Sequence, residues 1–168
     1  KIHIDIDPSS INKNVKVDLG LIGDVKLVLE KLVSVVKQKD PDFINSNKQK
    51  IAAWWSQIEN WRKKNSLGYV NSKDVIKPQY AVQRLYELTK AQDVFITTEV
   101  GQHQMWAAQH YKFDKPNRWM TSGGLGTMGY GLPAAVGVQV ANPDKLVIDI
   151  AGEASVLMTM QEMSTAVQ

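Results

Sequence analysis

The chain is 168 residues long, and 43% apolar residues are enough for the hydrophobic core of one ordinary domain. Its 20 basic and 17 acidic residues are scattered along the sequence, which argues against nucleic-acid binding. The sequence has no cysteine for a disulfide or a thiolate metal site, and no apolar run near the roughly 20 residues that span a membrane. We therefore expect a cytoplasmic protein with no membrane partner.

The first forty residues have the pattern of a strand followed by a helix. Isoleucines alternate with polar residues over positions 2–7, and Pro8 ends this strand pattern. Apolar residues recur at helical spacing over residues 24–37, with Asp24 placed to cap the first turn. We interpret residues 1–40 as the end of an α/β domain. Because the chain opens inside a strand pattern without Met and closes inside a helical one, we expect a fragment.

Residues 41–75 are expected to be a linker that carries a tryptophan-rich helix. The stretch 37–50 is polar and rich in Asp and Asn, which is typical of a linker. An apolar stripe at helical spacing follows and includes Trp54, Trp55 and Trp61. Tryptophans in such a stripe usually pack against other parts of a protein, so we interpret them as packing residues.

Strands and helices alternate from residue 76 to the end. The pattern predicts helices over 80–90, 101–111 and 132–140, buried strands over 93–100 and 146–150, and a last helix after residue 155. Such alternation is typical of a mostly parallel sheet flanked by helices, which binds ligands at the carboxyl ends of its strands. The predicted fold class is α/β, with residues 76–168 forming the first half of a second domain.

Residues 100–104, Val-Gly-Gln-His-Gln, are the first of three segments suited to binding an anion. A predicted strand gives way to a helix here, and the free amides at a helix start favour a phosphate. Gln102 and His103 add side-chain donors. Simple helix capping is the alternative for such polar residues.

The second segment is the glycine-rich stretch 123–131, which has five glycines in nine positions. Glycines remove side chains where a ligand or another backbone comes close, so a phosphate cradle is one natural use and tight helix packing is another. Gly124, Gly126 and Gly129 also match the spacing of the dinucleotide-binding pattern. No convincing apolar strand precedes them, which weakens that match.

The third segment is an acidic turn after the strand at 146–150. Glu153 can hold a hard cation there, while helix amides and Ser155 face the phosphate that the cation bridges. Capping by Glu153 or Ser155 is the simpler alternative for this segment alone. Taken together, two glycine-bearing anion sites and an acidic turn in one α/β region predict a diphosphate bridged by a divalent metal ion.

The same segments resemble the catalytic large subunit of acetolactate synthase (acetohydroxyacid synthase), a thiamine-diphosphate enzyme family. The resemblance is carried by residues 100–109, residues 121–135 and the Gly152 turn. Residues 4–8 and 22–25 are similar to the end of that family's central FAD-binding domain, and residues from 78 onward to the start of its Rossmann-like domain for thiamine diphosphate. The resemblance implies condensation of two 2-oxo acids (pyruvate with pyruvate or 2-oxobutyrate) with release of CO2, in branched-chain amino-acid biosynthesis. It also implies a homodimer or tetramer and a small regulatory subunit.

The resemblance further implies roles for single residues. Met128 would be the apolar wedge that keeps the cofactor bent, so that its own imine takes the proton from the reactive carbon. No residue of this chain would be catalytic by itself. The residues implied for thiamine diphosphate are Gln102, His103, Gly126, Thr127, Met128, Ala154 and Ser155; those implied for FAD are Asp5, Ile6, Asp24 and Val25; Mg²⁺ would be held by Glu153.

Position 153 departs from the family pattern, which has Asp where this chain has Glu153. Mg²⁺ requires near-octahedral geometry, so the additional methylene predicts weakened metal binding. The family's asparagine ligand and the activating glutamate of a partner subunit lie outside this sequence, so we expect the chain alone to be inactive. The alternatives are another thiamine-diphosphate decarboxylase or oxidase, a dinucleotide-binding oxidoreductase that uses residues 124–129, and a non-enzymatic remnant whose cofactor site has decayed.

Overall fold

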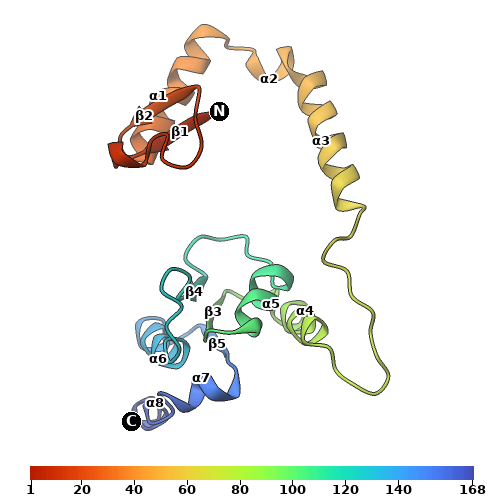
Figure 1. Cartoon of the computed structure of the whole chain (residues 1–168), viewed down its shortest axis with the longest axis vertical. Coiled ribbons are helices and arrows are strands. Elements are labelled where there is room, and N and C mark those ends of the chain that lie inside the picture. Colours follow the sequence, from red (N-terminus) through yellow and green to blue (C-terminus); the bar gives the residue numbers. More distant parts are fainter. The chain divides into compact units, whose positions relative to one another are not determined.

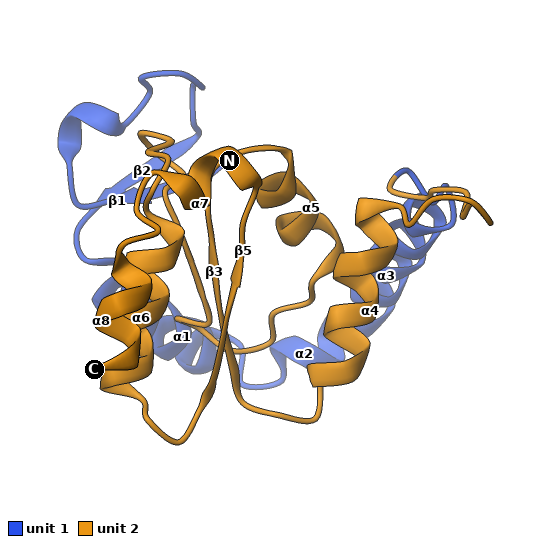
Figure 2. Ribbon diagram, turned by 90° about the horizontal axis from the view of Figure 1, so that it is seen from below, with its two compact units in different colours: residues 1–66 blue, residues 67–168 orange.

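The computed structural model describes all 168 residues and divides into two compact units, residues 1–66 and residues 67–168 (Figure 2). The division falls within the stretch expected to be a linker. The expected segments 1–40, 41–75 and 76–168 remain predictions. No helix combines the length and the apolar run that crossing a bilayer requires.

The first unit contains a two-stranded parallel sheet and a capped helix. Strand β1 (Ile2–Asp5) pairs with β2 (Leu19–Ile22), and a short 3-10 helix, η1 (Pro8–Ser10), lies between them in the sequence. Helix α1 (Val25–Lys39) begins as expected, because the Asp24 carboxylate accepts hydrogen bonds from the amides of Lys26 and Leu27 at 2.9 and 3.2 Å. Strand β2 was not predicted, since its four residues show too little alternation.

The tryptophan-rich helix of the first unit is exposed. Helix α2 (Phe43–Ser46) interrupts the stretch expected to be a linker, and α3 (Lys48–Arg62) follows it. Trp54, Trp55 and Trp61 are 58%, 52% and 47% exposed, so their interpretation as packing residues is wrong within this unit. Trp54 and Trp61 contact each other edge to face, with 5.5 Å between ring centroids. An isolated helix offers the stripe no second surface against which to pack.

The second unit is an α/β structure with one parallel sheet in the order β4-β3-β5 (Figure 1). Helices α6 and α8 lie on one side of β3 and β5, and α4 and α5 on the other (Figure 2). This arrangement confirms the predicted fold class. In chain order the elements are α4 (Pro78–Thr89), β3 (Val94–Thr98), α5 (Gln102–His110), β4 (Trp119–Thr121), α6 (Gly131–Ala141), β5 (Leu146–Ile150), α7 (Glu153–Leu157) and α8 (Glu162–Val167).

Strand β3 is the centre of this unit because it pairs with both neighbours and is buried along its whole length. Val94 and Ile96 pack with Val82 of α4 and with Tyr111 at the end of α5. Aromatic side chains extend this core. Their ring centroids are 5.4 Å apart for Tyr86 and Tyr111, 5.0 Å for Tyr111 and Phe113, and 5.5 Å for Phe113 and Trp119.

Two expectations for the second unit need correction. Strand β4 ends at Thr121, two positions before the glycine-rich segment, so a short strand does precede this segment, contrary to expectation. The strand was missed because it has three residues. Helix α6 nevertheless begins at Gly131, after the last glycine of the dinucleotide-like pattern. The single last helix is in fact two short helices, separated by a turn over residues 158–161.

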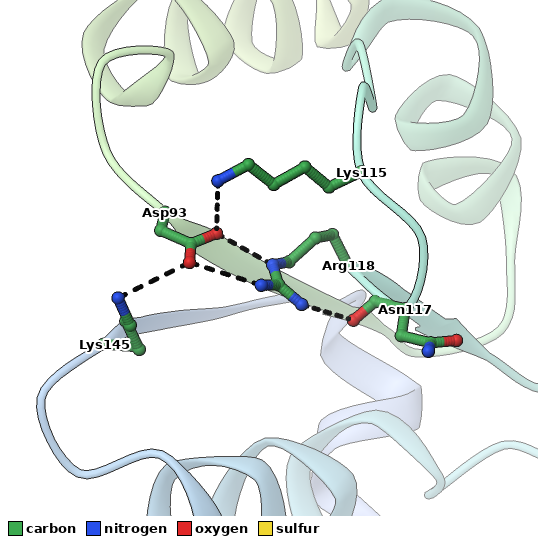
Figure 3. A network of polar contacts seen from close by, with 5 residues as sticks. All are labelled: Asp93, Lys115, Asn117, Arg118 and Lys145. Carbon is green, nitrogen blue, oxygen red and sulfur yellow. Dashed lines mark hydrogen bonds and ion pairs between the residues drawn. The ribbon is translucent and has the colours of Figure 1, made fainter.

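An ion-pair network joins the amino ends of the three strands (Figure 3). Asp93, Arg118 and Lys145 each directly precede a strand, and the Asp93 carboxylate pairs with both basic residues and with Lys115. Arg118 binds both carboxylate oxygens, at 2.8 and 3.2 Å, and its guanidinium carbon lies 4.2 Å from the Phe95 ring centroid. The hydrogen bonds from Arg118 hold the pKa of Asp93 far below its usual range. The network thus fixes the strands at the end opposite the predicted ligand segments.

Candidate functional site

The turns after β3 and β5 lie side by side at the carboxyl ends of the sheet. The Ser155 hydroxyl donates a hydrogen bond to the Val100 carbonyl at 3.0 Å, and Ser155 is 2% exposed. The Glu99 amide donates to the Ile150 carbonyl at 3.1 Å, which extends the pairing of the two strands by one step. The first and third predicted segments are therefore brought together, as parallel strands require.

The His103 ring packs between two glycines of these turns. A Cβ added to Gly101 would lie 2.7 Å from the ring carbon Cε1, and one added to Gly152 would lie 3.0 Å from the same atom. A side chain at position 101 would force the ring to shift, and one at position 152 would press against it. The Nε2 atom of His103 is buried and has no hydrogen-bond partner within the chain. A buried nitrogen without a partner is costly, so this atom is suited to bind a polar group of a ligand.

The glycine-rich segment reaches the same place. Gly126 has a φ of +64°, a conformation that favours glycine, and a Cβ added to it would lie 3.8 Å from the Val100 side chain. The two residues that precede the segment are also tied to α5 through Gln104, whose side-chain amide donates to the Thr121 hydroxyl at 2.6 Å and to the Ser122 carbonyl at 3.3 Å. All three predicted segments thus meet at one end of the sheet.

The remaining residues implied for thiamine diphosphate differ in their exposure and in whether they already have hydrogen-bond partners. Gln102 and Ala154 are exposed, and Met128 is 37% exposed. The Thr127 amide, expected to face the diphosphate, instead donates to the Ser122 hydroxyl at 2.9 Å. Leu125 at the tip of the segment is 95% exposed. The roles of these residues remain predictions.

Glu153 begins helix α7 and is exposed. No group of three or more His, Asp or Glu residues suited to a metal ion exists in the chain. The residues present fit a diphosphate through His103 and the helix starts, whereas they supply one carboxylate toward a cation and not a full ligand set. The metal role of Glu153 remains a prediction.

Two acidic groups beneath the site were not identified as functional from the sequence. Glu99 is fully buried, and its carboxylate accepts hydrogen bonds from the amides of Gly129 and Leu132. Asp149 accepts a hydrogen bond from the Thr97 hydroxyl at 2.8 Å, and burial raises the pKa of its carboxyl, with the nearby Glu99 charge acting in the same direction. An acid at the end of an apolar strand and just before a glycine turn is the signal that could have indicated Glu99.

The residues implied for FAD lie in the first unit, at the carboxyl ends of β1 and β2. The Gly23 amide donates to the Asp5 carbonyl at 2.9 Å, which brings Asp5 close to Asp24 at the start of α1. Ile6 and Val25 are 72% and 55% exposed. The Asp5 and Asp24 carboxylates already accept hydrogen bonds from nearby amides. Their role toward FAD remains a prediction.

Comparison with known proteins identifies the class to which the second unit belongs. Residues 99–168 match the family model "Thiamine pyrophosphate enzyme, C-terminal TPP binding domain". This range begins at Glu99 and contains all three segments that meet at the end of the sheet. The second unit therefore carries part of a thiamine pyrophosphate-binding domain.

Three individual relatives are similar to the chain over nearly its whole length. The chain is 47% identical over 167 residues to acetolactate synthase isozyme 3 large subunit of Escherichia coli (strain K12), a match that covers 99% of this chain and 28% of the relative. It is 48% identical over 167 residues to the acetolactate synthase large subunit of Buchnera aphidicola subsp. Schizaphis graminum, with the same coverage. It is 45% identical over 164 residues to acetolactate synthase 1, chloroplastic, of Nicotiana tabacum, covering 98% of this chain and 24% of the relative.

These matches confirm the resemblance. The chain is a homologue of the acetolactate synthase large subunits over nearly its whole length, and it spans about a quarter of the length of these relatives.

Proposed function

We propose that the chain is the cofactor-binding portion of an acetolactate synthase, which joins two 2-oxo acids with release of CO2. The observation that carries the proposal is the convergence of three segments on the carboxyl ends of β3 and β5. Ser155 of the third segment bonds to the backbone of the first, and His103 of the first packs against Gly152 of the third. This is the geometry that one shared diphosphate group requires.

The residues of the site have distinct tasks in this proposal. His103 would hold the diphosphate through its Nε2 atom, which is buried and has no partner within the chain. The amide of Gly126 and the start of α7 add backbone donors, and Glu153 supplies a carboxylate to Mg²⁺. Met128 offers a partly exposed apolar side chain on which the cofactor rings can rest. Thiamine diphosphate, when bound, supplies the carbon nucleophile that these residues do not have.

Further features of the whole enzyme are part of the same proposal. The substrates are pyruvate and a second 2-oxo acid, pyruvate or 2-oxobutyrate. FAD binds at Asp5, Ile6, Asp24 and Val25 of the first unit, and the subunits assemble as a dimer or tetramer with a small regulatory subunit. The cytoplasm is the proposed location, although the tobacco relative is named as chloroplastic.

A chimera tests the proposal. This chain replaces the matching 167-residue segment of the Escherichia coli isozyme 3 large subunit, and acetolactate formation from pyruvate is measured with and without thiamine diphosphate and Mg²⁺. The chimera should be active only when both are present, whereas NAD should have no effect. A chimera that folds and assembles as its parent does, yet binds no thiamine diphosphate by calorimetry, would overturn the proposal.

A further inference from the structure

Glu99 is a buried acid that the site described above leaves without a task. It follows the last residue of β3 and has no exposed surface. Its Oε2 atom accepts a hydrogen bond from the Gly129 amide at 2.7 Å, and its Oε1 atom accepts one from the Leu132 amide at 3.0 Å. Both carboxylate oxygens are therefore satisfied by the backbone. Burial of an ionised group is tolerated only with such compensation.

The two amides that Glu99 binds belong to the end of the glycine-rich segment and to the first turn of α6. Gly129 has a φ of +84°, and its carbonyl accepts a hydrogen bond from the Thr159 hydroxyl at 3.4 Å. Leu132 carries one of the amides that a helix start leaves without an intrahelical partner. Tyr130, the residue at the cap position of α6, makes no side-chain cap hydrogen bond. Glu99 thus caps α6 from the neighbouring strand, with the charge that a helix amino terminus prefers.

This contact also decides which helix start is free for a phosphate. The carboxylate of Glu99 already occupies the amino terminus of α6, where a dinucleotide would be bound in the pattern that Gly124, Gly126 and Gly129 resemble. The starts of α5 and α7 and the Nε2 atom of His103 remain. The Glu99 amide donates to the Ile150 carbonyl, so a single residue links β3, β5 and the glycine-rich segment.

We propose that Glu99 is a positioning residue of the cofactor site: by bridging the amides of Gly129 and Leu132, it fixes the glycine-rich segment in the shape that receives the diphosphate and closes the α6 start to other anions. The inference rests on the proposed function, because it takes thiamine diphosphate as the ligand. The bridge itself involves only residues of this chain.

The first test measures the bridge without any cofactor. Amide hydrogen exchange is compared in the full chain and in its variants Glu99→Gln and Glu99→Asp. The Gln side chain places an NH2 group against an amide N–H, so the protection of Gly129 and Leu132 should fall at least tenfold. The Asp carboxylate is shorter by one methylene and should restore part of the protection. Unchanged protection of these two amides in both variants would overturn the proposal.

The second test connects the bridge to ligand binding. In the chimera, Glu99→Gln should raise the Kd for thiamine diphosphate about tenfold, and Glu99→Asp should raise it less. Asp93→Asn is the matched control, because it removes a carboxylate charge at the opposite end of the same strand and should leave this Kd unchanged. If Glu99→Gln fails to fold, Glu99→Asp decides the matter: an unchanged Kd overturns the proposal, and a Kd raised above that of the unsubstituted chimera supports it.

The two tests separate the two proposals. If the unmodified chimera binds no thiamine diphosphate while the exchange experiment shows the bridge, the proposed function fails and the structural role of Glu99 stands. If the chimera binds the cofactor and Glu99→Gln changes neither exchange nor affinity, the proposed function stands and the role of Glu99 fails.

Discussion

Two acidic residues at opposite ends of β3 are satisfied in different ways. Asp93, at the amino end, is paired with basic side chains that precede β4 and β5, and its side chain is 24% exposed. Glu99, at the carboxyl end, is fully buried and paired with backbone amides. The first arrangement ties three strands together. The second shapes the glycine-rich segment at the end of the sheet where we propose that the ligand binds and where the Nε2 atom of His103 has no partner within the chain.

The largest effect is expected for an alanine at Gly131. Its Cβ would lie 2.5 Å from Asp149 Oδ1 and 2.6 Å from the Glu99 amide nitrogen. Because a backbone atom of a buried strand is involved, the clash cannot be relieved by a side-chain rotation, and Gly131→Ala should lower the free energy of unfolding by about 3 kcal/mol.

Gly137→Ala is the control for this clash. Position 137 lies in the same helix with no atom within 4 Å of an added Cβ, so alanine there should stabilise the chain by about 0.5–1 kcal/mol. Urea unfolding of both variants measures the difference. Similar stability changes in the two variants would mean that the packing around Gly131 is not as described.

Replacing the His103 imidazole with a ring that has no nitrogen tests whether Nε2 binds the ligand. His103→Phe keeps a flat side chain between Gly101 and Gly152 but removes Nε2, so the Kd for thiamine diphosphate in the chimera should rise about thirtyfold. His110→Phe, at the other end of α5, should leave the Kd unchanged. Calorimetric titration of both variants checks this expectation. Equal affinities would show that the imidazole does not touch the ligand.

Shortening the side chain of residue 153 should strengthen the binding of Mg²⁺. Glu153→Asp restores the residue expected from the family pattern, so the Mg²⁺ concentration that half-saturates cofactor binding should fall about tenfold in the chimera. The affinity for thiamine diphosphate at saturating Mg²⁺ should change little. A Mg²⁺ titration followed by tryptophan fluorescence measures the effect. No change in the Mg²⁺ requirement would argue against a metal role for position 153.

The two ends of the sheet should respond to pH with opposite sign, and this is the smallest expected effect. The pKa of Asp93 is lowered by folding, so its contribution to stability is present above the usual value of 3.8 and is lost as pH falls toward the folded pKa. The pKa of Asp149 is raised by folding, so its contribution is present below 3.8 and is lost as pH rises through the folded pKa.

Substitution of each acid isolates its share of the pH dependence. Asp93→Asn should be less stable than the unsubstituted chain at pH 7, and its stability should decrease less as the pH is lowered. Asp149→Asn keeps an acceptor for the Thr97 hydroxyl and should be slightly more stable at neutral pH. Thermal unfolding from pH 3 to pH 8 measures both. A common sign for the two variants would contradict the comparison.

Long patterns made most of the second unit predictable. The buried strand β3 and the helices around it have five or more residues at regular spacing, whereas β4 has only three residues and the four residues of β2, Leu-Gly-Leu-Ile, show too little alternation. The convergence of the three segments could be predicted because parallel strands end at the same edge. Glu99 was missed because its partners lie 30 and 33 positions away and donate from the backbone, which no side-chain pattern records.

The first unit shows where periodicity misleads. The stripe on α3 has the spacing of a buried helix face, yet Trp54 is 58% exposed because no other element of the unit faces it. Spacing predicts which residues share a face, and the presence of a second surface decides whether that face is covered.

The placement of the His103 imidazole between two glycines 51 positions apart constrains how this sequence can drift. A side chain gained at position 101 forces the ring to shift, and one gained at position 152 makes a tight contact with it, unless residue 103 has already become smaller. The cost of a mutation at one of the three positions therefore depends on the residues at the other two, and a change that is tolerated in one genetic background is expected to be harmful in another.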